Sequence, residues 1–168
     1  MAVALMHRNS RTERERGLAL LGQVRGMCVQ GRYFLSEIPM LDVYTEWERA
    51  RRGDHDAALP LLRGAVDDLF HAGQLGFCIV ASAVLVGTLL DRGADGDVAD
   101  AEAAIERLAV APADDGLVIR DIWLLRLRTL LSRARGDETG YRDHRDRYRA
   151  MATSLGFEGH IAWAEAMP

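Results

Sequence analysis

The side chains that most often carry out catalysis or bind metals are few in this sequence and widely spaced. Of the five histidines, the closest pairs, His55 with His71 and His144 with His160, lie 16 residues apart. Short metal-binding motifs place two ligands only a few positions apart, as in Cys-x2-Cys. No such spacing occurs, so the sequence predicts no metal site, and each histidine is expected at the surface or at a helix end.

Two cysteines, Cys28 and Cys78, are each surrounded by apolar residues. A reactive thiol needs a neighbouring base or a helix N-terminus, so both are expected to be buried and inert. Buried, reduced thiols are typical of cytoplasmic proteins. Adjacent aspartates at 67–68 and 114–115 suggest acid–base chemistry, but neighbouring residues on a helix point in different directions. This favours solvated positions for them, with Asp115 capping the helix that follows.

The composition excludes several classes of enzyme. All 21 basic residues are arginine, and the chain has no lysine. Phosphate-binding loops of the Gly-Lys-Ser/Thr type, Schiff-base enzymes, pyridoxal phosphate enzymes and kinases all need a lysine. A formal net charge of −4 also argues against a nucleic-acid-binding protein. The sequence therefore predicts no cofactor, no catalytic activity in this chain and no direct contact with nucleic acid.

A stripe along one expected helix is the best candidate for a partner-binding surface. Its four residues are spaced by four, three and four positions: Ile122, Arg126, Thr129 and Arg133. On a helical wheel this 122–133 stripe lies opposite an apolar face that we assign to the core, made of Trp123, Leu127, Leu130, Leu131 and Ala134. We expect the stripe to line a groove, and the alternative is an ordinary solvated helix face.

Two further groups of arginines alternate with acidic residues. In the first, aspartates at 143 and 146 interrupt the arginines of residues 142–149, which favours ion pairing within one helix over an anion-binding site. In the second, Glu13 and Glu15 only partly balance four arginines, so residues 8–16 form the most basic patch of the chain.

Helices are expected to position all of these residues, because alanine, leucine and arginine dominate and the alternation typical of strands is missing. The run from Leu75 to Leu90 has no charge over 16 residues, whereas a membrane span needs roughly 20. We expect a buried central helix there and no membrane insertion. The N-terminal stretch lacks the basic start of a signal peptide and is more typical of the end of a helix.

Punctuating residues mark the helix boundaries. Ser10 with Glu13 forms a capping-box pattern for a helix over 11–29, with an apolar stripe of Leu18, Leu21, Val24 and Cys28. Pro39 falls in the first turn of a second helix that ends near Arg52, with an expected buried face of Met40, Val43, Tyr44, Trp47 and Ala50.

Gly-Asp pairs at 53–54, 96–97 and 136–137 separate further helices, with glycine ending one and aspartate capping the next. The intervals of 43 and 40 residues are typical of an α-solenoid with two helices per unit. The expected hairpins are 37–52 with 56–72, 75–92 with 97–110, and 117–134 with 138–155. A last helix near 159–166 is expected to cap the array.

One segment resembles the turn and second helix of a tetratricopeptide repeat. It runs from Gly53 to Leu59 and continues with Leu62 and Ala65. In that resemblance the small residues Ala58 and Ala65 let neighbouring helices approach closely, while the leucines fill the space between them. The segment 42–49 departs from the usual first helix, so the resemblance is to a divergent, tetratricopeptide-like array.

Three longer segments, 67–76, 116–131 and 141–168, look like the C-terminal helical tail of large actinobacterial regulators. Those proteins combine an adenylate/guanylate cyclase domain or a LuxR-type output domain with an ATPase domain and a tetratricopeptide-like region. The resemblance covers that tail alone, and no cyclase carboxylates, Walker lysine or helix-turn-helix are present to carry over. It implies a regulatory fragment or a stand-alone copy of one.

Together these patterns predict an all-α, tetratricopeptide-like α-solenoid of about eight helices, forming one domain over residues 1–168. The expected function is a non-catalytic protein-interaction or regulatory module in the cytoplasm, whose partner is another protein or an adjacent domain of a signalling regulator. A homodimer stays open. The alternative is a sensor of a small apolar or anionic effector that uses Tyr44, Trp47 or the arginines of the 122–133 stripe. A deep closed pocket would favour the sensor, and an open groove the interaction module.

Overall fold

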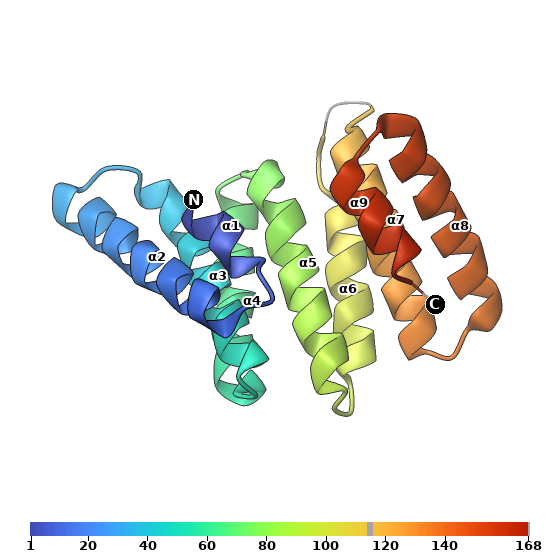
Figure 1. The fold of residues 1–168 in the computed structure, drawn as a ribbon, viewed down its shortest axis with the longest axis horizontal. Coiled ribbons are helices and arrows are strands. Elements are labelled where there is room, and N and C mark those ends of the chain that lie inside the picture. The colour runs from blue at the N-terminus through green and yellow to red at the C-terminus, as the bar shows by residue number, and fades with distance from the viewer. Residues whose placement is uncertain (114–115, 168) are drawn as a thin grey trace. The chain divides into compact units, whose positions relative to one another are not determined.

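The computed structural model describes residues 1–113 and 116–167, and every regular element in these ranges is helical (Figure 1). This confirms the all-α class. The described residues form nine α-helices, and the one beyond the expected eight is the short α1 at the N-terminus. The helices are α1 (Ala2–Met6), α2 (Arg11–Gly31), α3 (Ile38–Arg51), α4 (His55–His71), α5 (Leu75–Arg92), α6 (Asp97–Val110), α7 (Val118–Ala134), α8 (Glu138–Leu155) and α9 (Glu158–Glu165).

Most of the expected helix boundaries are confirmed by their local structure. The Ser10 hydroxyl accepts a hydrogen bond of 3.4 Å from the backbone N–H of Glu13 at the start of α2. Pro39 lies in the first turn of α3, after a single 3-10 turn (Leu35–Glu37). Gly136 has a φ of +70°, which suits glycine, and Asp137 then caps α8 by accepting from the Gly140 N–H at 3.0 Å.

The other expected aspartate caps have different outcomes. Asp54 occupies the N-cap position of α4, without a hydrogen bond from its side chain to the helix. Asp97 is not a cap, because α6 begins at Asp97 itself and Gly96 takes the N-cap position. The Asp97 carboxylate is instead buried and accepts from Arg92 at 2.6 Å. The expected cap at Asp115 lies outside the described residues.

The chain divides into two compact units, Met1–Thr88 (unit 1) and Leu89–Pro168 (unit 2). In unit 1, α3 packs against α4 as an antiparallel hairpin, and α2 packs against both α1 and α3. The repeat-like segment of α4 is buried as expected, including Ala58, Leu59, Leu62 and Ala65. Three expected core positions are less buried, since Val24 is 43% exposed and both Leu18 and Trp47 are only half-buried. Two acidic residues of α3, Glu46 and Glu48, are buried instead.

In unit 2, α7 packs against both α6 and α8, and α9 packs against α8. The hairpins 37–52 with 56–72 and 117–134 with 138–155 are therefore present, and the expected last helix is α9. A core cluster joins three helices through Ile122, Tyr148, Ala152 and Ala164. The expected pairing of 75–92 with 97–110 crosses from one unit to the other and stays a prediction.

Among the residues described, α5 is the one helix that is long and apolar enough to cross a membrane, with a mean hydropathy of 1.7 over 18 residues. The core helices of soluble proteins share this length and composition. More than half of α5, 56% of that window, is buried within the protein, which agrees with the expected buried helix.

Candidate functional site

The 122–133 stripe on α7 is not the exposed surface that the helical wheel suggests. Ile122 and Thr129 are both 0% exposed, and the Thr129 hydroxyl donates a hydrogen bond of 2.8 Å to the Leu125 carbonyl. Arg126 is partly buried, and only Arg133 is exposed. The prediction that these four residues form one solvent-facing stripe is therefore wrong.

The reason is that α7 has neighbours on two sides. Leu127 and Leu131 are buried on the face that we assign to the core. On the opposite face, Ile122 packs into the cluster that α7 forms with α8 and α9. A helical wheel assumes one buried face, and a helix held between α6 and α8 has two. Ala134, which we also expect in the core, lies exposed at the C-terminal end of α7.

An aromatic cluster lies beside Arg126 in unit 2. The ring of His160 is 5.1 Å from that of Trp123 and 5.2 Å from that of Trp163, centroid to centroid. The Tyr148 hydroxyl lies 2.9 Å from His160 Nδ1. Burial, and then the charge of Arg126, lower the pKa of His160. His160 is only 8% exposed, so the expectation of a surface histidine is wrong here.

The remaining candidates for chemistry stay apart from one another. Within residues 1–113 and 116–167, no three histidine, cysteine or carboxylate side chains come together as metal ligands. Cys28 and Cys78 are buried and form no disulfide, as expected. The arginines of α8 include the expected intrahelical pairs, with Arg142 bound to Glu138 at 2.8 Å and Arg147 to Asp143 at 3.3 Å.

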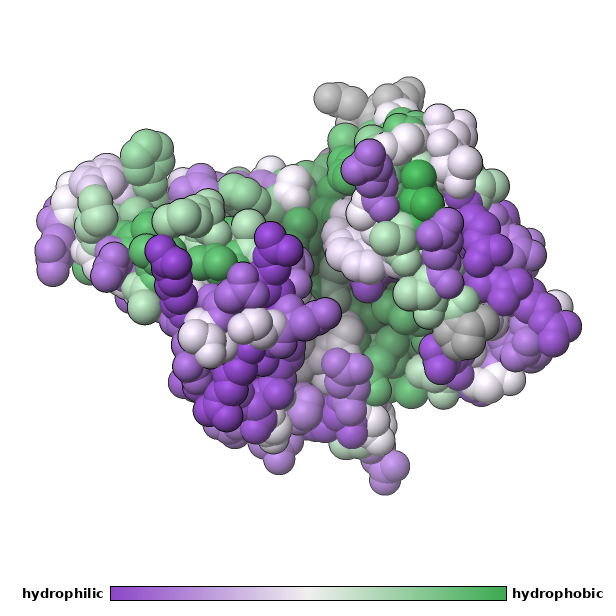
Figure 2. Space-filling model, in the orientation of Figure 1, coloured by the Kyte–Doolittle hydropathy of each residue, from purple (hydrophilic) through white to green (hydrophobic). Residues whose placement is uncertain are grey.

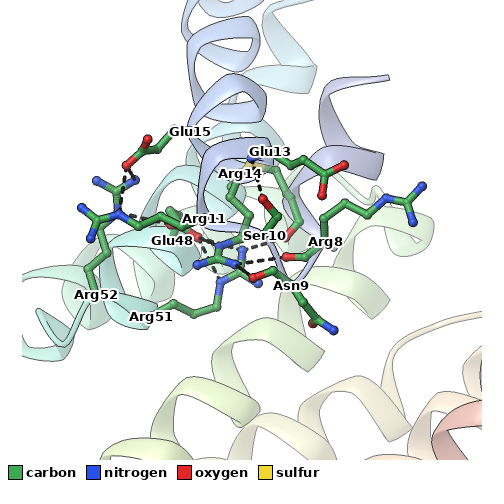
Figure 3. Close-up of polar contacts among 11 residues, drawn as sticks. Arg8, Asn9, Ser10, Arg11, Glu13, Arg14, Glu15, Glu48, Arg51 and Arg52 are labelled. Atoms are coloured by element: carbon green, nitrogen blue, oxygen red, sulfur yellow. Dashed lines mark hydrogen bonds and ion pairs between the residues drawn. The ribbon is translucent and has the colours of Figure 1, made fainter.

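Two of the four arginines of the most basic patch, Arg11 and Arg14, form ion pairs in unit 1 (Figure 3). Glu48 of α3 is 0% exposed and accepts hydrogen bonds from three arginines. Its partners are Arg14 of α2 at 2.9 Å, Arg51 at 3.1 Å and Arg52 at 3.2 Å. We call Glu48 with these three arginines the Glu48 node.

The Glu48 node joins the N-terminal elements to α3. Arg14 also donates to the Asn9 carbonyl at 2.7 Å, and Arg51 donates to the Met6 carbonyl at 2.6 Å. Burial raises the pKa of Glu48, but hydrogen bonds and charges from Arg52, Arg51 and Arg14 outweigh burial and leave the pKa lowered. The carboxylate is therefore ionised and saturated with donors, which makes the node a structural element rather than a site for a ligand.

A groove runs between α2, α3 and α4 on unit 1, with a volume of about 650 Å³. Each of the three helices supplies both apolar and charged residues to it. We call it the unit 1 groove, and its lining is Leu18, Gly22, Arg25, Pro39, Asp42, Thr45, Glu46, Leu61, Gly64, Ala65 and Asp68.

The charge of the unit 1 groove is predominantly negative. Asp42 pairs with Arg25 at 2.8 Å, which leaves Glu46 and Asp68 as the further carboxylates. The Glu46 side chain is 9% exposed and lies 2.9 Å from Arg49 Nη1, but this contact is too poorly aligned to be a hydrogen bond for Glu46 Oε2. Burial raises the pKa of Glu46; Arg49 opposes this, and Asp42 and Asp54 add to it.

Unit 2 has a second, smaller hollow of about 410 Å³ at the turn between α7 and α8. Arg133 of the expected stripe lies there with Arg142 and Arg145, whose charges are paired with Glu138 and Asp146. Fewer apolar residues line this hollow than line the unit 1 groove, and its lining comes from one hairpin only. We therefore regard the unit 1 groove as the stronger candidate for binding.

The surface is uneven in character (Figure 2). Hydrophobic residues gather over the C-terminal half of α2 and the segment after it, whereas hydrophilic residues cover α8. On α2, Val24, Met27 and Val29 are all more than two-fifths exposed, and Phe34 beyond it is 69% exposed. This apolar surface thus lies largely on α2, the helix that also forms one wall of the unit 1 groove.

Sequence reasoning missed most of this site. Asp42 and Glu46 are spaced i, i+4 on α3, which is a detectable signal, but nothing in the sequence places Asp68 of α4 beside them. Comparisons of the chain with protein-family models, curated proteins and solved structures each give no match.

Proposed function

We propose that this chain is a non-catalytic protein-interaction module made of tetratricopeptide-like helical hairpins, and that the unit 1 groove binds a basic segment of its partner. The observation that carries the proposal is the groove itself, which is open, is lined by three helices and contains more carboxylates than cations. Helical-repeat proteins bind extended partners on surfaces of this kind.

The hairpin geometry supports the repeat part of the proposal. In unit 1, Ala58 and Ala65 of α4 are 0% and 7% exposed, and small residues at these positions allow α3 and α4 to pack closely. Unit 2 repeats the arrangement with α7 and α8. The proposal extends this pattern into one continuous α-solenoid, with α9 as its capping helix.

The chemistry of the groove supports a basic partner. Arg25, its one arginine, is already engaged by Asp42 at 2.8 Å, and the buried Glu46 is paired with Arg49 at 2.9 Å, so an incoming cation meets the carboxylate of Asp68. Leu18 and Leu61 provide apolar surface beside these charges. An arginine or lysine side chain can bury its aliphatic stem against such residues while its charged end reaches a carboxylate.

The experiment selects peptides from a random display library on the purified chain and sequences those retained. We expect enrichment of segments with arginine or lysine next to apolar residues. The affinity of a selected peptide is then measured by fluorescence anisotropy for the wild type, Asp68→Arg and Asp67→Arg. The last two variants change the net charge equally on the same helix, but Asp67 does not line the groove.

The proposal expects Asp68→Arg to weaken binding at least about tenfold, a loss of about 1.4 kcal/mol, and Asp67→Arg to leave the affinity near that of the wild type. Binding should also weaken with added salt, because surface charges are screened. Enrichment of acidic or purely apolar peptides, or equal losses in the two variants, would contradict a basic partner in this groove.

The wider setting is part of the same proposal. We place the module in the cytoplasm, which the two buried cysteines without a disulfide support. Its attachment to a cyclase-type or LuxR-type signalling regulator rests on the sequence resemblance alone. Residues 8–16 of this chain are themselves rich in arginine. If the selected peptides resemble this segment, the partner is a second copy of the chain.

A further inference from the structure

Arg126 differs from the other partly buried arginines of the protein. Its guanidinium carbon lies 4.6 Å from the ring centroid of Trp163 and 5.3 Å from that of Trp123. The two indole rings come from α9 and α7, and their centroids are 5.6 Å apart. The cation is therefore held against two aromatic rings, which fixes its orientation.

In the parts of the chain that the structure describes, no carboxylate pairs with Arg126, and its Nε is buried without a hydrogen-bond acceptor. Arg14 is also partly buried, and it binds Glu48 at 2.9 Å. Arg92 likewise binds Asp97. An arginine in a protein stays protonated, so Arg126 contributes a positive charge that no described acid compensates.

The groups around Arg126 are suited to an anion. Burial lowers the pKa of Arg126, which reflects the cost of holding this charge away from water. Tyr148 and His160, joined by a 2.9 Å hydrogen bond, both lie close enough to interact with its charge. Arg126 itself keeps part of its surface exposed, and Trp163 beside it is 37% exposed, so this cluster borders solvent.

We propose that Arg126, oriented by Trp123 and Trp163, binds an oxyanion, the carboxylate or phosphate group of a small ligand, in unit 2. A guanidinium recognises both groups through two parallel N–H donors. Bound anion supplies the missing countercharge, and the indole rings cover the ligand from the sides. This site is independent of the unit 1 groove, so either proposal can fail without the other.

The test uses the tryptophans as reporters. Trp47→Phe removes the one tryptophan of unit 1, so the emission then comes from Trp123 and Trp163, which are the other two of the three. This protein is titrated with inorganic phosphate and, separately, with acetate at constant ionic strength, with chloride as the control. We expect a saturable change in emission with at least one oxyanion and none with chloride. The arm that saturates at lower concentration identifies phosphate or carboxylate as the preferred group.

Two variants in the same background localise the effect. Arg126→Gln should weaken the apparent affinity about tenfold or more, and Arg126→Lys should retain part of it. Arg133→Gln is the matched control, because it removes the same charge from the same helix two turns away. Circular dichroism confirms that each variant is folded before titration.

Stability separates a binding role from a structural one. Without added oxyanion, Arg126→Gln should melt at the same temperature as its parent or higher, because an uncompensated charge has been removed. With a saturating oxyanion, only the parent should gain stability. Two results would overturn the proposal and make Arg126 a structural residue. One is a change in tryptophan emission that is the same for chloride and for the oxyanions. The other is a large fall in the Tm of Arg126→Gln without ligand.

Discussion

Replacing Glu48 by glutamine tests the description of unit 1 most directly. The substitution keeps the size of the side chain and one acceptor oxygen but removes the negative charge from the Glu48 node. Three guanidinium groups, those of Arg14, Arg51 and Arg52, then lie close together without their shared carboxylate. The free energy of unfolding should fall because like charges are brought together and donors lose their acceptor.

The size of the loss follows from the burial of the partners. Breaking a buried ion pair by removing one member costs about 3–5 kcal/mol. The Glu48 side chain is 1% exposed, whereas those of Arg14, Arg51 and Arg52 are 17%, 26% and 42% exposed. Water can therefore solvate part of the released charge, and we expect a loss at the lower end of the range, about 3 kcal/mol. Domains of this size are stable by about 5–15 kcal/mol, so the variant should be folded but clearly weakened.

Urea unfolding followed by circular dichroism at neutral pH measures the difference. Glu138→Gln is the control, because the Glu138 side chain is 65% exposed and binds Arg142 at the surface. Loss of such an exposed pair should cost less than about 1 kcal/mol. A Glu48→Gln effect as small as that of the control would refute the claim that the node stabilises unit 1.

The pH dependence provides a second check. The pKa of Glu48 is lowered in the folded protein, while an unfolded glutamate titrates near about 4.3. The stabilisation by its charge is therefore complete above that pH and is lost as the pH falls through the lower, folded-state pKa. The gap between wild type and Glu48→Gln should close on acidification below about pH 4, and a gap that is constant with pH would contradict the electrostatic explanation.

Four other perturbations have definite expected outcomes. Ile122→Ala should lower the free energy of unfolding in urea by about 2–5 kcal/mol, because the side chain is 0% exposed in the core of unit 2. A loss under about 0.5 kcal/mol would show that Ile122 lies at the surface. Burial raises the pKa of Tyr148 to about 12, so its ultraviolet absorbance should change at a higher pH than that of an exposed tyrosine. The stability that Tyr148 provides should be complete below about pH 10 and be lost as the pH rises through about 12. Ionisation of Tyr148 near pH 10 in the folded protein would disprove its burial. Gly26→Ala should stabilise α2 by about 0.5–1 kcal/mol, because nothing lies within 4 Å of an added Cβ. At Gly17 the same change should give no gain in Tm, since a Cβ there would lie 2.8 Å from Met6 Sδ; equal gains would show that α1 is not packed against α2.

The helices could be predicted closely because their ends depend on local chemistry. The expected 138–155 coincides with α8, where Gly136 needs a left-handed backbone and Asp137 caps the following turn. Pro39 located the start of α3 in the same way. Each of these signals involves residues within a few positions of one another, so no knowledge of the tertiary structure is needed to interpret them.

The unit 1 groove, the second buried face of α7 and the Glu48 node could not be predicted because each depends on which helices meet. The helical wheel for α7 separates Ile122 from Leu127, but only the packing shows that both sides are covered. A charged residue such as Glu48 is expected at the surface, yet Glu48 is buried. One of its hydrogen-bond donors, Arg14, lies 34 residues earlier in the chain. The sequence does show that Arg51 and Arg52 follow Glu48 at i+3 and i+4, a spacing that allows ion pairs within one helix.

The Glu48 node also determines how unequally its members should tolerate change. Any one of the three arginines can be lost while two cations still compensate the buried carboxylate. Loss of the carboxylate instead leaves three cations clustered together. In a saturation library selected for soluble expression, we therefore expect positions 14, 51 and 52 each to accept several residue types singly, and position 48 to accept almost none. Pairs of arginine replacements should be depleted far more than the product of the single effects, because the second loss removes the redundancy that hides the first.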